Sequence, residues 1–323
     1  MRRVLRGHYR SFIRPDGICC LWVFFLTLCL LLLGCDNGKE KKAPVVRLDK
    51  LKALAAARPE TSSIPFRVAV AAIVSPEGTV ESYRPLLAYL GEKLNRKTQL
   101  IQRRTYWEVN DMIAKNRVDL AFICTGAYIQ QEKMHAMSIL VVPEIDGKVT
   151  YNAVIIVSAK SNIQSFEDLR GKVFAFTDPL SNTGYLYPLH LLTERCSTPD
   201  EFFHKTIFTY SHDRSIMAVV DGVADGASVD NIVYENALRK DPRLKKKLKV
   251  IMKSEDFGMP PVVVPSNISS IKRKRLESIF LHMHEDPKGR AALKHLGIDR
   301  FVRPTMELYS APCLKYKDQP CSK

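Results

Sequence analysis

Short apolar runs alternate with amphipathic segments from Phe66 onward, and this alternation constrains the fold of the chain more than any other feature. Between the runs, apolar residues recur at spacings of three and four, as Leu86, Leu90 and Leu94 do. The expected strands are 66–71, 99–103, 118–124, 138–143, 151–158, 172–177, 206–208, 226–229, 248–252 and 262–264. The expected helices are 83–94, 107–115, 185–194, 214–221 and 271–284. This order is typical of an α/β fold with largely parallel sheets.

The patterned part of the chain is about 260 residues long, which is more than one sheet and its helices require. We therefore expect two α/β lobes. No Walker loop, dinucleotide fingerprint or heptad array interrupts the pattern, and no cofactor is indicated.

The segment 174–185 is the most informative, because an apolar strand runs through a polar turn directly into a helix. Ser181, Asn182 and Thr183 are favourable N-cap residues, and backbone N–H groups at a helix start suit a phosphate-like oxyanion. Gly184 removes a side chain that would obstruct close approach. The alternative is that Ser181 or Thr183 only caps the helix. Composition does not separate these two interpretations.

The segment 178–188, Asp-Pro-Leu-Ser-Asn-Thr-Gly-Tyr-Leu-Tyr-Pro, resembles the DPxSxSGYxxP signature of phosphate, phosphite and phosphonate substrate-binding proteins of ABC importers. The resemblance covers roughly residues 66–305, and only this motif is specific by itself. Weaker agreement in order and spacing occurs at 83–90, 117–122, 166–172, 211–213 and 219–225.

The resemblance implies the two-lobed type II periplasmic-binding fold, in which each lobe is a sheet flanked by helices and two crossover strands join the lobes. The first lobe would comprise 64–155 and, after a return crossover, 251–323, and the second lobe 156–250. The ligand would be closed between the lobes by a hinge movement.

The resemblance also implies, by position, a set of ligand-binding residues without a formal positive charge. Hydroxyl, amide and N–H groups can bind an oxyanion without an ion pair. The second lobe would supply Ser181, Asn182, Thr183 and His212, and the first lobe Tyr106, Thr125 and Tyr151. Relatives that bind aminoalkylphosphonates place carboxylates opposite the amine, and Asp230 is the nearest candidate here.

A purely structural role is the alternative for several of these residues. For His212, beside Asp213, the less favoured alternative is a surface histidine, and for Asp230 a helix cap is at least as favoured as ligand contact. One of the neighbours Tyr106 and Trp107 is expected to pack in the core.

The chain departs from the family pattern at two positions. Cys124-Thr125-Gly126 stands where relatives usually have Gly-Pro, which puts the assignment of Thr125 in doubt. Asn182 stands where a small hydroxyl residue is common, and its larger side chain narrows the pocket. The organic group of the ligand, if there is one, is left open.

A hydrolytic enzyme is the main competing class, with Ser181, His212 and Asp230 as a triad. No G-x-S-x-G elbow surrounds Ser181, and a capping serine uses its oxygen as an acceptor. A metal site is not indicated either, because His282 and His284 point to different faces of a helix. We therefore expect no enzyme and no metal, but a binding component of an importer. Its partners would be an ABC permease and ATPase or, alternatively, a sensor kinase.

The first 34 residues have the layout of a signal peptide, with five arginines followed by an apolar run at 18–33. The run is 16 residues long, short of the roughly 20 that a permanent membrane helix needs. The sequence Leu-Leu-Gly-Cys at 32–35 resembles the lipobox of bacterial lipoproteins, which implies that Cys35 is acylated. An ordinary buried cysteine is the alternative, but no folded core surrounds it. We expect residues 35–63 to be the lipid anchor and tether.

Asp36 resembles the signal that retains lipoproteins of some Gram-negative bacteria on the inner membrane, so we expect the protein at its periplasmic face. The leader carries a net charge of +4, which leaves about +11 of the formal +15 on the mature chain. This charge is not interleaved with aromatic residues, so nucleic acid is not an expected partner. Cys313 and Cys321 are a candidate disulfide, whereas Cys124 and Cys196 are expected to be buried thiols.

Overall fold

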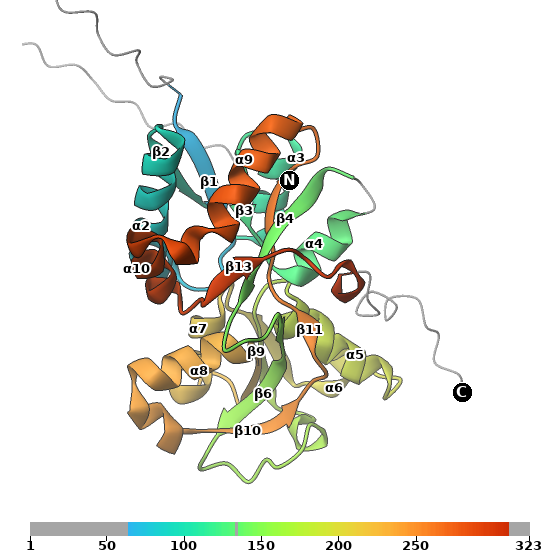
Figure 1. Cartoon of the computed structure of the whole chain (residues 1–323). Helices are drawn as coiled ribbons and strands as arrows, with labels where there is room; N and C mark the ends of the chain where they lie inside the picture. Colours follow the sequence, from blue (N-terminus) through green and yellow to red (C-terminus); the bar gives the residue numbers. More distant parts are fainter. Residues whose placement is uncertain (1–63, 133–134, 310–323) are drawn as a thin grey trace, which may run out of the picture. The chain divides into compact units, whose positions relative to one another are not determined.

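The computed structural model describes residues 64–132 and 135–309, which form two sheets flanked by helices (Figure 1). The expected leader, lipid anchor and tether, and the cysteine pair at 313 and 321, lie outside these residues. The first sheet has the order β13-β4-β12-β3-β1-β2. Its strands are β1 (Phe66–Val70), β2 (Thr98–Gln102), β3 (Leu120–Phe122), β4 (Met137–Glu144), β12 (Val262–Pro265) and β13 (Arg300–Val302).

The second sheet has the order β10-β6-β9-β7-β8. Its strands are β6 (Ala153–Ser158), β7 (Val173–Phe176), β8 (Lys205–Phe208), β9 (Gly226–Asp230) and β10 (Leu248–Lys253). Both sheets belong to one compact unit of the chain, 59–323. The two-lobed α/β architecture expected from the sequence is therefore confirmed.

Both sheets are mixed, so the expectation of largely parallel sheets was wrong. Parallel pairing joins β1 to β2 and β3 in the first sheet, and β7 to β8 and β9 in the second. The remaining pairs, which involve β4, β12 and β13 in one sheet and β6 and β10 in the other, are antiparallel. The reason is that β4, β6, β10 and β12 flank the passages between the sheets, so they run against the strands of the parallel βαβ units.

Two crossover segments carry the chain between the sheets, and each contains a short strand. In these segments β5 (Thr150–Tyr151) pairs antiparallel with β11 (Phe257–Gly258). The expected lobe boundaries at 155/156 and 250/251 fall inside β6 and β10, both of which lie wholly in the second sheet. The chain passes between the sheets at 145–152 and 254–261 instead. The expected strand at 151–158 conceals the end of the crossover, because Asn152 is the one residue that separates β5 from the apolar strand β6.

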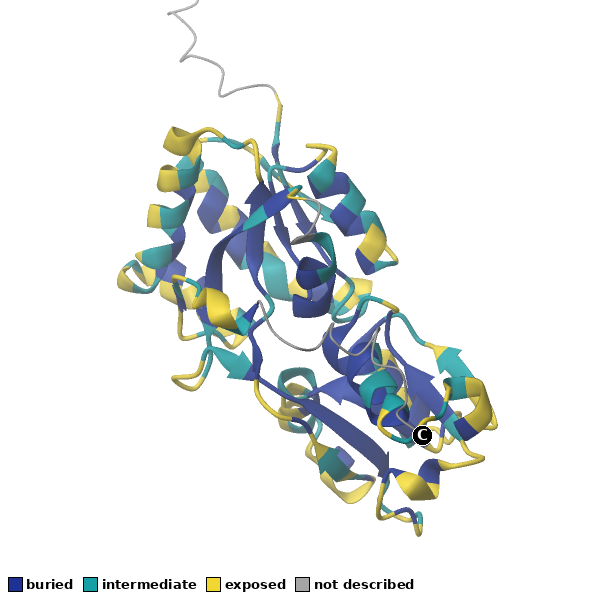
Figure 2. Ribbon diagram, turned by 90° about the vertical axis from the view of Figure 1, so that its right-hand side faces the viewer, coloured by how far each residue is buried: buried dark blue, intermediate teal, exposed yellow. Residues whose placement is uncertain are grey.

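Helices cover both faces of each sheet, as the alternation of buried residues along β1 shows. Val68 and Val70 pack on one face, and Ala69 on the other. Successive side chains of a strand point to opposite faces, so a strand buried on both faces is apolar throughout. Figure 2 accordingly shows the strands buried and the outer helix faces exposed.

On the first sheet, one face is covered by α2 (Pro76–Leu94), α9 (Ser270–Leu281) and α10 (Pro287–Leu296) and the other by α3 (Tyr106–Ala114) and α4 (Thr125–Glu132). On the second sheet, α5 (Tyr187–Thr193) and α6 (Pro199–Phe202) cover one face, and α7 (His212–Val220) and α8 (Asn231–Lys240) the other. The five expected helices are present, whereas α4, α6, α8 and α10 were not anticipated. None of the described helices is long and apolar enough to cross a membrane.

Candidate functional site

The polar turn after β7 enters its helix through a π-helical turn, η3 (Asn182–Leu186), which continues as α5. The Ser181 hydroxyl accepts a hydrogen bond from the N–H of Gly184 at 3.0 Å, so Ser181 is the N-cap of this turn. A Cβ atom on Gly184 would lie 2.1 Å from the Thr177 Oγ1. Glycine is therefore required for packing against Thr177. Such π-turns recur at functional sites.

All eight candidate residues are buried, with side chains at most 3% exposed. They come from three parts of the fold: the first lobe, the second lobe and a crossover. The first lobe contributes Tyr106 and Thr125, and the second Ser181, Asn182, Thr183, His212 and Asp230. Tyr151 lies in the crossover strand β5, and not in the first lobe as expected. Of the neighbours Tyr106 and Trp107, the first is buried and the second 58% exposed.

Contacts between the lobes bring these residues together. The backbone N–H of Tyr106 donates to Asp178 Oδ2 at 3.0 Å, and that of Asn182 lies 3.4 Å from Cys124 Sγ. A Cβ atom on Gly126 would lie 2.7 Å from the carbonyl oxygen of Leu180. The start of α4 in the first lobe is therefore packed directly against the turn before η3 in the second.

A second set of interlobe contacts lies at the start of α7. The N–H of His212 donates to the Ile73 carbonyl oxygen at 3.0 Å. The Asp213 carboxylate accepts from the N–H of Ser75 with both oxygens, at 3.0 and 3.1 Å. Ser75 is the N-cap residue of α2, so a carboxylate of one lobe stabilises a helix start of the other. Asp178 and Asp213 were not foreseen, because nothing in local sequence marks a partner 72 or 138 residues away.

Several buried polar groups of the cluster have no hydrogen-bond partner among the described residues. These are the hydroxyls of Tyr106, Tyr151 and Thr183 and both side-chain polar atoms of Asn182. Leaving a buried polar group unpaired costs about 1–3 kcal/mol, and native proteins contain only a few such groups. Their concentration at the junction of the lobes indicates a place for a polar ligand.

Both tyrosines of the cluster are neutral hydrogen-bond donors. Burial raises the pKa of Tyr106 and of Tyr151 well above the ordinary value for a phenol. The side chain of Ser181 lies close enough to the Tyr106 hydroxyl, and those of Thr125 and Asn182 to the Tyr151 hydroxyl, to oppose these shifts by weak hydrogen bonding, although none of these pairs has full hydrogen-bond geometry. The residues expected to surround one ligand are therefore neighbours in the structure.

Thr125, which the resemblance implied as a ligand-binding residue, forms a hydrogen bond within the protein. Its hydroxyl donates to the Gly258 carbonyl oxygen of β11 at 2.7 Å, so its hydrogen is already engaged. Next to it, burial raises the pKa of the Cys124 thiol, although nearby N–H groups of Asn182, Gly126 and Ala127 oppose the shift. The burial of Cys124 is confirmed, but its place inside the cluster was not foreseen. Cys196, also expected to be buried, is exposed, because it lies in a turn after α5 with φ of 48°.

His212 is buried, and the surface interpretation was wrong. Its Nδ1 accepts from the backbone N–H of Asp230 at 3.1 Å and lies 3.3 Å from Thr177 Oγ1. Nδ1 is therefore the unprotonated nitrogen, and Nε2 carries the hydrogen. Burial lowers the pKa of His212 to about 3, so the imidazole is neutral at physiological pH.

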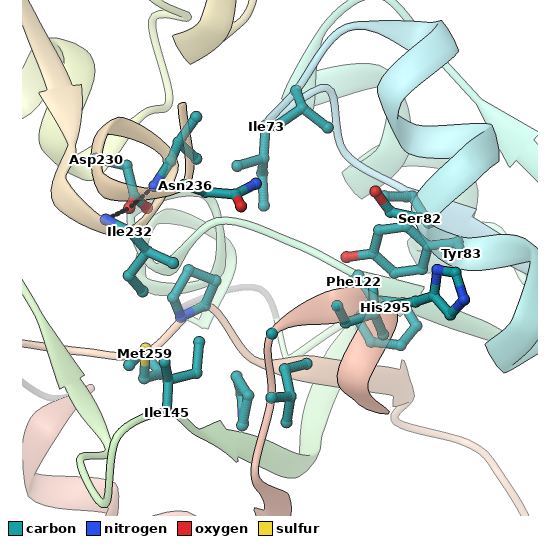
Figure 3. A pocket seen from close by; sticks show the side chains of 18 of the residues that line it. Ile73, Ser82, Tyr83, Phe122, Ile145, Asp230, Ile232, Asn236, Met259 and His295 are labelled. Carbon is teal, nitrogen blue, oxygen red and sulfur yellow. Dashed lines mark hydrogen bonds between the residues drawn. The ribbon is translucent and has the colours of Figure 1, made fainter. Parts of the chain in front are cut away.

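Asp230 caps α8, as the alternative from the sequence proposed. Its Oδ1 accepts from the N–H groups of Ile232 at 2.7 Å and Val233 at 3.2 Å. Burial raises the pKa of its carboxyl to about 7. Asp230 also lines a crevice of about 310 Å³ beside the cluster (Figure 3).

The geometry does not form a hydrolytic triad. The Ser181 hydroxyl is held by the Gly184 N–H, and the His212 ring bonds the backbone of Asp230 instead of its carboxylate. Within residues 64–132 and 135–309, no group of three or more His, Cys, Asp or Glu side chains is placed to hold a metal ion. The arrangement supplies neutral donors and no nucleophile with an adjacent base.

Comparison with known proteins relates this arrangement to one family. The family model described as "ABC transporter, phosphonate, periplasmic substrate-binding protein" matches residues 68–309. The phosphate-import protein PhnD of Mycolicibacterium smegmatis is 28% identical over 186 residues, which cover 54% of this chain and 58% of that protein. The match thus spans less than two thirds of the curated relative.

Solved structures agree with the fold. A binding protein component of an ABC phosphonate transporter from Pseudomonas aeruginosa has a TM-score of 0.73 and 20% identity, over 78% of this chain and 85% of its own. PhnD1 from Prochlorococcus marinus, solved in complex with methylphosphonate, has a TM-score of 0.68 and 17% identity, over 76% of this chain and 94% of its own. The expected type II periplasmic-binding fold is confirmed.

Proposed function

Because the chain belongs to the family of periplasmic phosphonate-binding proteins of ABC transporters, we propose that it captures a phosphate-like oxyanion between its lobes for import. The ligand class comprises phosphonates, phosphite and phosphate. Its direct partners in this role are the permease and ATPase of the importer.

One observation carries the proposal: the unpartnered hydroxyl and amide groups of Tyr106, Tyr151, Asn182 and Thr183 at the junction of the lobes. A tetrahedral oxyanion has several acceptor oxygens, which match the hydroxyl, amide and N–H donors of the cluster. Hydrogen bonds to a charged acceptor are stronger than those between neutral groups, so an anion compensates these buried donors best.

The uncharged hydrogen-bond donors of the site favour binding of a ligand over a chemical reaction with it. The His212 imidazole and both phenols are donors that hold their hydrogens at neutral pH. The Ser181 oxygen serves as a cap and is not aligned with a base. We therefore propose that the ligand is bound and released unchanged, without an enzymatic reaction.

The proposal extends to the N-terminal region. Acylated Cys35 would hold the protein at the periplasmic face of the inner membrane, with 36–63 as a tether. Several acyl chains on one residue anchor stably, whereas a single chain binds reversibly. A variant in which residues 1–35 are replaced by a leader that is cleaved without lipidation should move from the membrane fraction to the soluble periplasmic fraction without changing ligand affinity. Persistence of the variant in the membrane fraction would contradict the anchor.

Isothermal titration calorimetry of the folded domain with phosphate, phosphite and methylphosphonate tests the ligand class. We expect saturable binding with one site for at least one of them. At about 100 times its dissociation constant, that ligand should add roughly 2.7 kcal/mol to the free energy of unfolding. The variant T183V removes one unpartnered hydroxyl at nearly constant volume and should weaken binding without lowering stability. Absence of heat and of a melting shift with all three ligands would refute the proposed function.

A further inference from the structure

The crevice beside Asp230 differs in chemistry from the oxyanion cluster. It has a volume of about 310 Å³, at the lower end of the roughly 300–1,000 Å³ typical of small-molecule pockets. Its lining is mainly aliphatic and aromatic and includes Ile73, Phe122, Ile145, Ile232 and Met259, and the basic residues Arg239, Lys240, Lys294 and His295 also contribute to it. In Figure 3 these side chains surround an open space, with Asp230 and Asn236 on one side and Ser82 and Tyr83 on the other. The apolar part of this lining suits a hydrocarbon group.

The crevice adjoins the cluster. Asp230 lines it, and the N–H of Asp230 bonds the ring of His212. Ile73, also in the lining, accepts the hydrogen bond from the His212 backbone. Ile123 in the lining precedes Cys124, whose sulfur contacts the Asn182 N–H. A ligand whose charged head contacts the cluster can therefore place an attached group in the crevice.

The position of the crevice is also typical of a ligand site. It lies beyond the carboxyl ends of the parallel strands β1 and β3, where Val70, Ala71, Phe122 and Ile123 line it. In open α/β sheets, ligands bind outside the carboxyl ends of the strands. The opposite wall is formed along α8 in the other lobe, by Ile232, Val233, Asn236, Arg239 and Lys240.

We propose that this crevice receives the organic substituent of the ligand, and that the chain selects phosphonates with an extended apolar group of butyl or benzyl size. The inference rests on the proposed function and names the substrate class of the same site. It separates two subsites: the cluster binds the phosphonate head, and the crevice sets the preference for the group bonded to phosphorus.

Calorimetry with methylphosphonate and n-butylphosphonate tests the proposal, because the two ligands share a head and differ only in chain length. Each buried methylene contributes roughly a fourfold gain in affinity. The three extra methylenes should therefore tighten binding by at least about tenfold, allowing for partial burial.

Variants that fill the crevice sharpen the test. Ser82 on α2 and Asn236 on α8 line the crevice at its outer part, and neither is fully buried. S82F and N236F should each weaken butylphosphonate by about tenfold, the advantage of the longer chain, and leave methylphosphonate within about twofold. Ala88, exposed on α2 and outside the crevice, gives the matched control A88F, which should change neither affinity.

The outcomes separate the two proposals. Butylphosphonate binding no tighter than methylphosphonate would overturn the substituent subsite, while the proposed function would stand. Equal weakening of both ligands by S82F and N236F would also overturn it, because it would indicate a general distortion. If neither ligand binds the wild-type protein, the proposed function itself fails.

Discussion

Tyr151 and Tyr309 are both buried tyrosines, but they differ in whether the hydroxyl has a hydrogen-bond partner. The hydroxyl of Tyr309 donates to the Met259 carbonyl oxygen at 2.6 Å, whereas that of Tyr151 has no partner among the described residues. Both side chains are at most 1% exposed, so burial does not distinguish them. This difference is the basis of our proposal that the partnered hydroxyl stabilises the fold, whereas the unpartnered one binds a ligand.

The other buried polar residues at the junction of the lobes also fall into two groups, with and without hydrogen-bond partners. Asp178, Asp213 and Thr125 have partners that join the lobes or the crossovers. The groups without partners, on Tyr106, Asn182 and Thr183, lie among them at the same junction. We propose that the partnered residues position the lobes so that the unpartnered ones face a common ligand.

The largest expected effect comes from removing two unpartnered hydroxyls together. The double variant Y106F/Y151F should weaken methylphosphonate binding at least a hundredfold, because each hydrogen bond to a charged group contributes about 1.5–3 kcal/mol. Calorimetry measures the affinity, and urea unfolding without ligand should show no loss of stability. Retention of wild-type affinity would place the ligand elsewhere.

The second effect concerns pH, and it tests the partnered ionisable residues of the site. His212, with its pKa lowered to about 3, stabilises the folded state increasingly as pH rises from about 3 to 6.5. Asp230, with its pKa raised to about 7, acts in the opposite direction, because the folded state retains a proton that the unfolded chain loses above about pH 4. Between about pH 4 and 6.5 the two contributions oppose each other.

The variant D230N should remove only the Asp230 contribution, because asparagine also caps a helix. Its free energy of unfolding should then rise with pH between about 4 and 6.5, relative to the wild-type profile, by up to about 1.4 kcal/mol per pH unit. Urea unfolding at a series of pH values measures this. Parallel profiles of D230N and wild type would contradict the buried, protonated state of Asp230.

A smaller effect is expected at an interlobe contact. In D178N only one of the two backbone N–H groups, of Tyr106 or Leu180, retains an acceptor. We expect binding of methylphosphonate to weaken about tenfold, equivalent to about 1.4 kcal/mol, because the lobes are held less firmly around the ligand. Asp225, which accepts from the Val173 N–H within the second lobe, gives the control D225N. Equal losses of affinity in both variants would argue against an interlobe role for Asp178.

The sequence predicted the local elements of the candidate site better than it predicted the connections between them. Local features sufficed for η3, because a capping serine and small polar residues directly follow an apolar strand. The same is true of the strand and helix order, which apolar periodicity determines. Asp178 and Asp213 were missed because their partners, Tyr106 and Ser75, are distant in sequence and are backbone groups. Whether a buried hydroxyl has a partner is likewise decided by tertiary structure, so the contrast between Tyr151 and Tyr309 has no signal in the sequence.

The measurement that tests the account most directly compares Y151F with Y309F, in unfolding without ligand and in methylphosphonate binding. In the absence of ligand, Y151F should raise the free energy of unfolding by about 1 kcal/mol, because it removes a buried polar group that has no partner. Y309F should lower it by about 1 kcal/mol, because it leaves the Met259 carbonyl oxygen unpaired. Only Y151F should weaken methylphosphonate binding, by about tenfold or more. Destabilisation of both variants to the same extent, with methylphosphonate affinity unchanged in Y151F, would contradict the assignment of the unpartnered hydroxyls to a ligand.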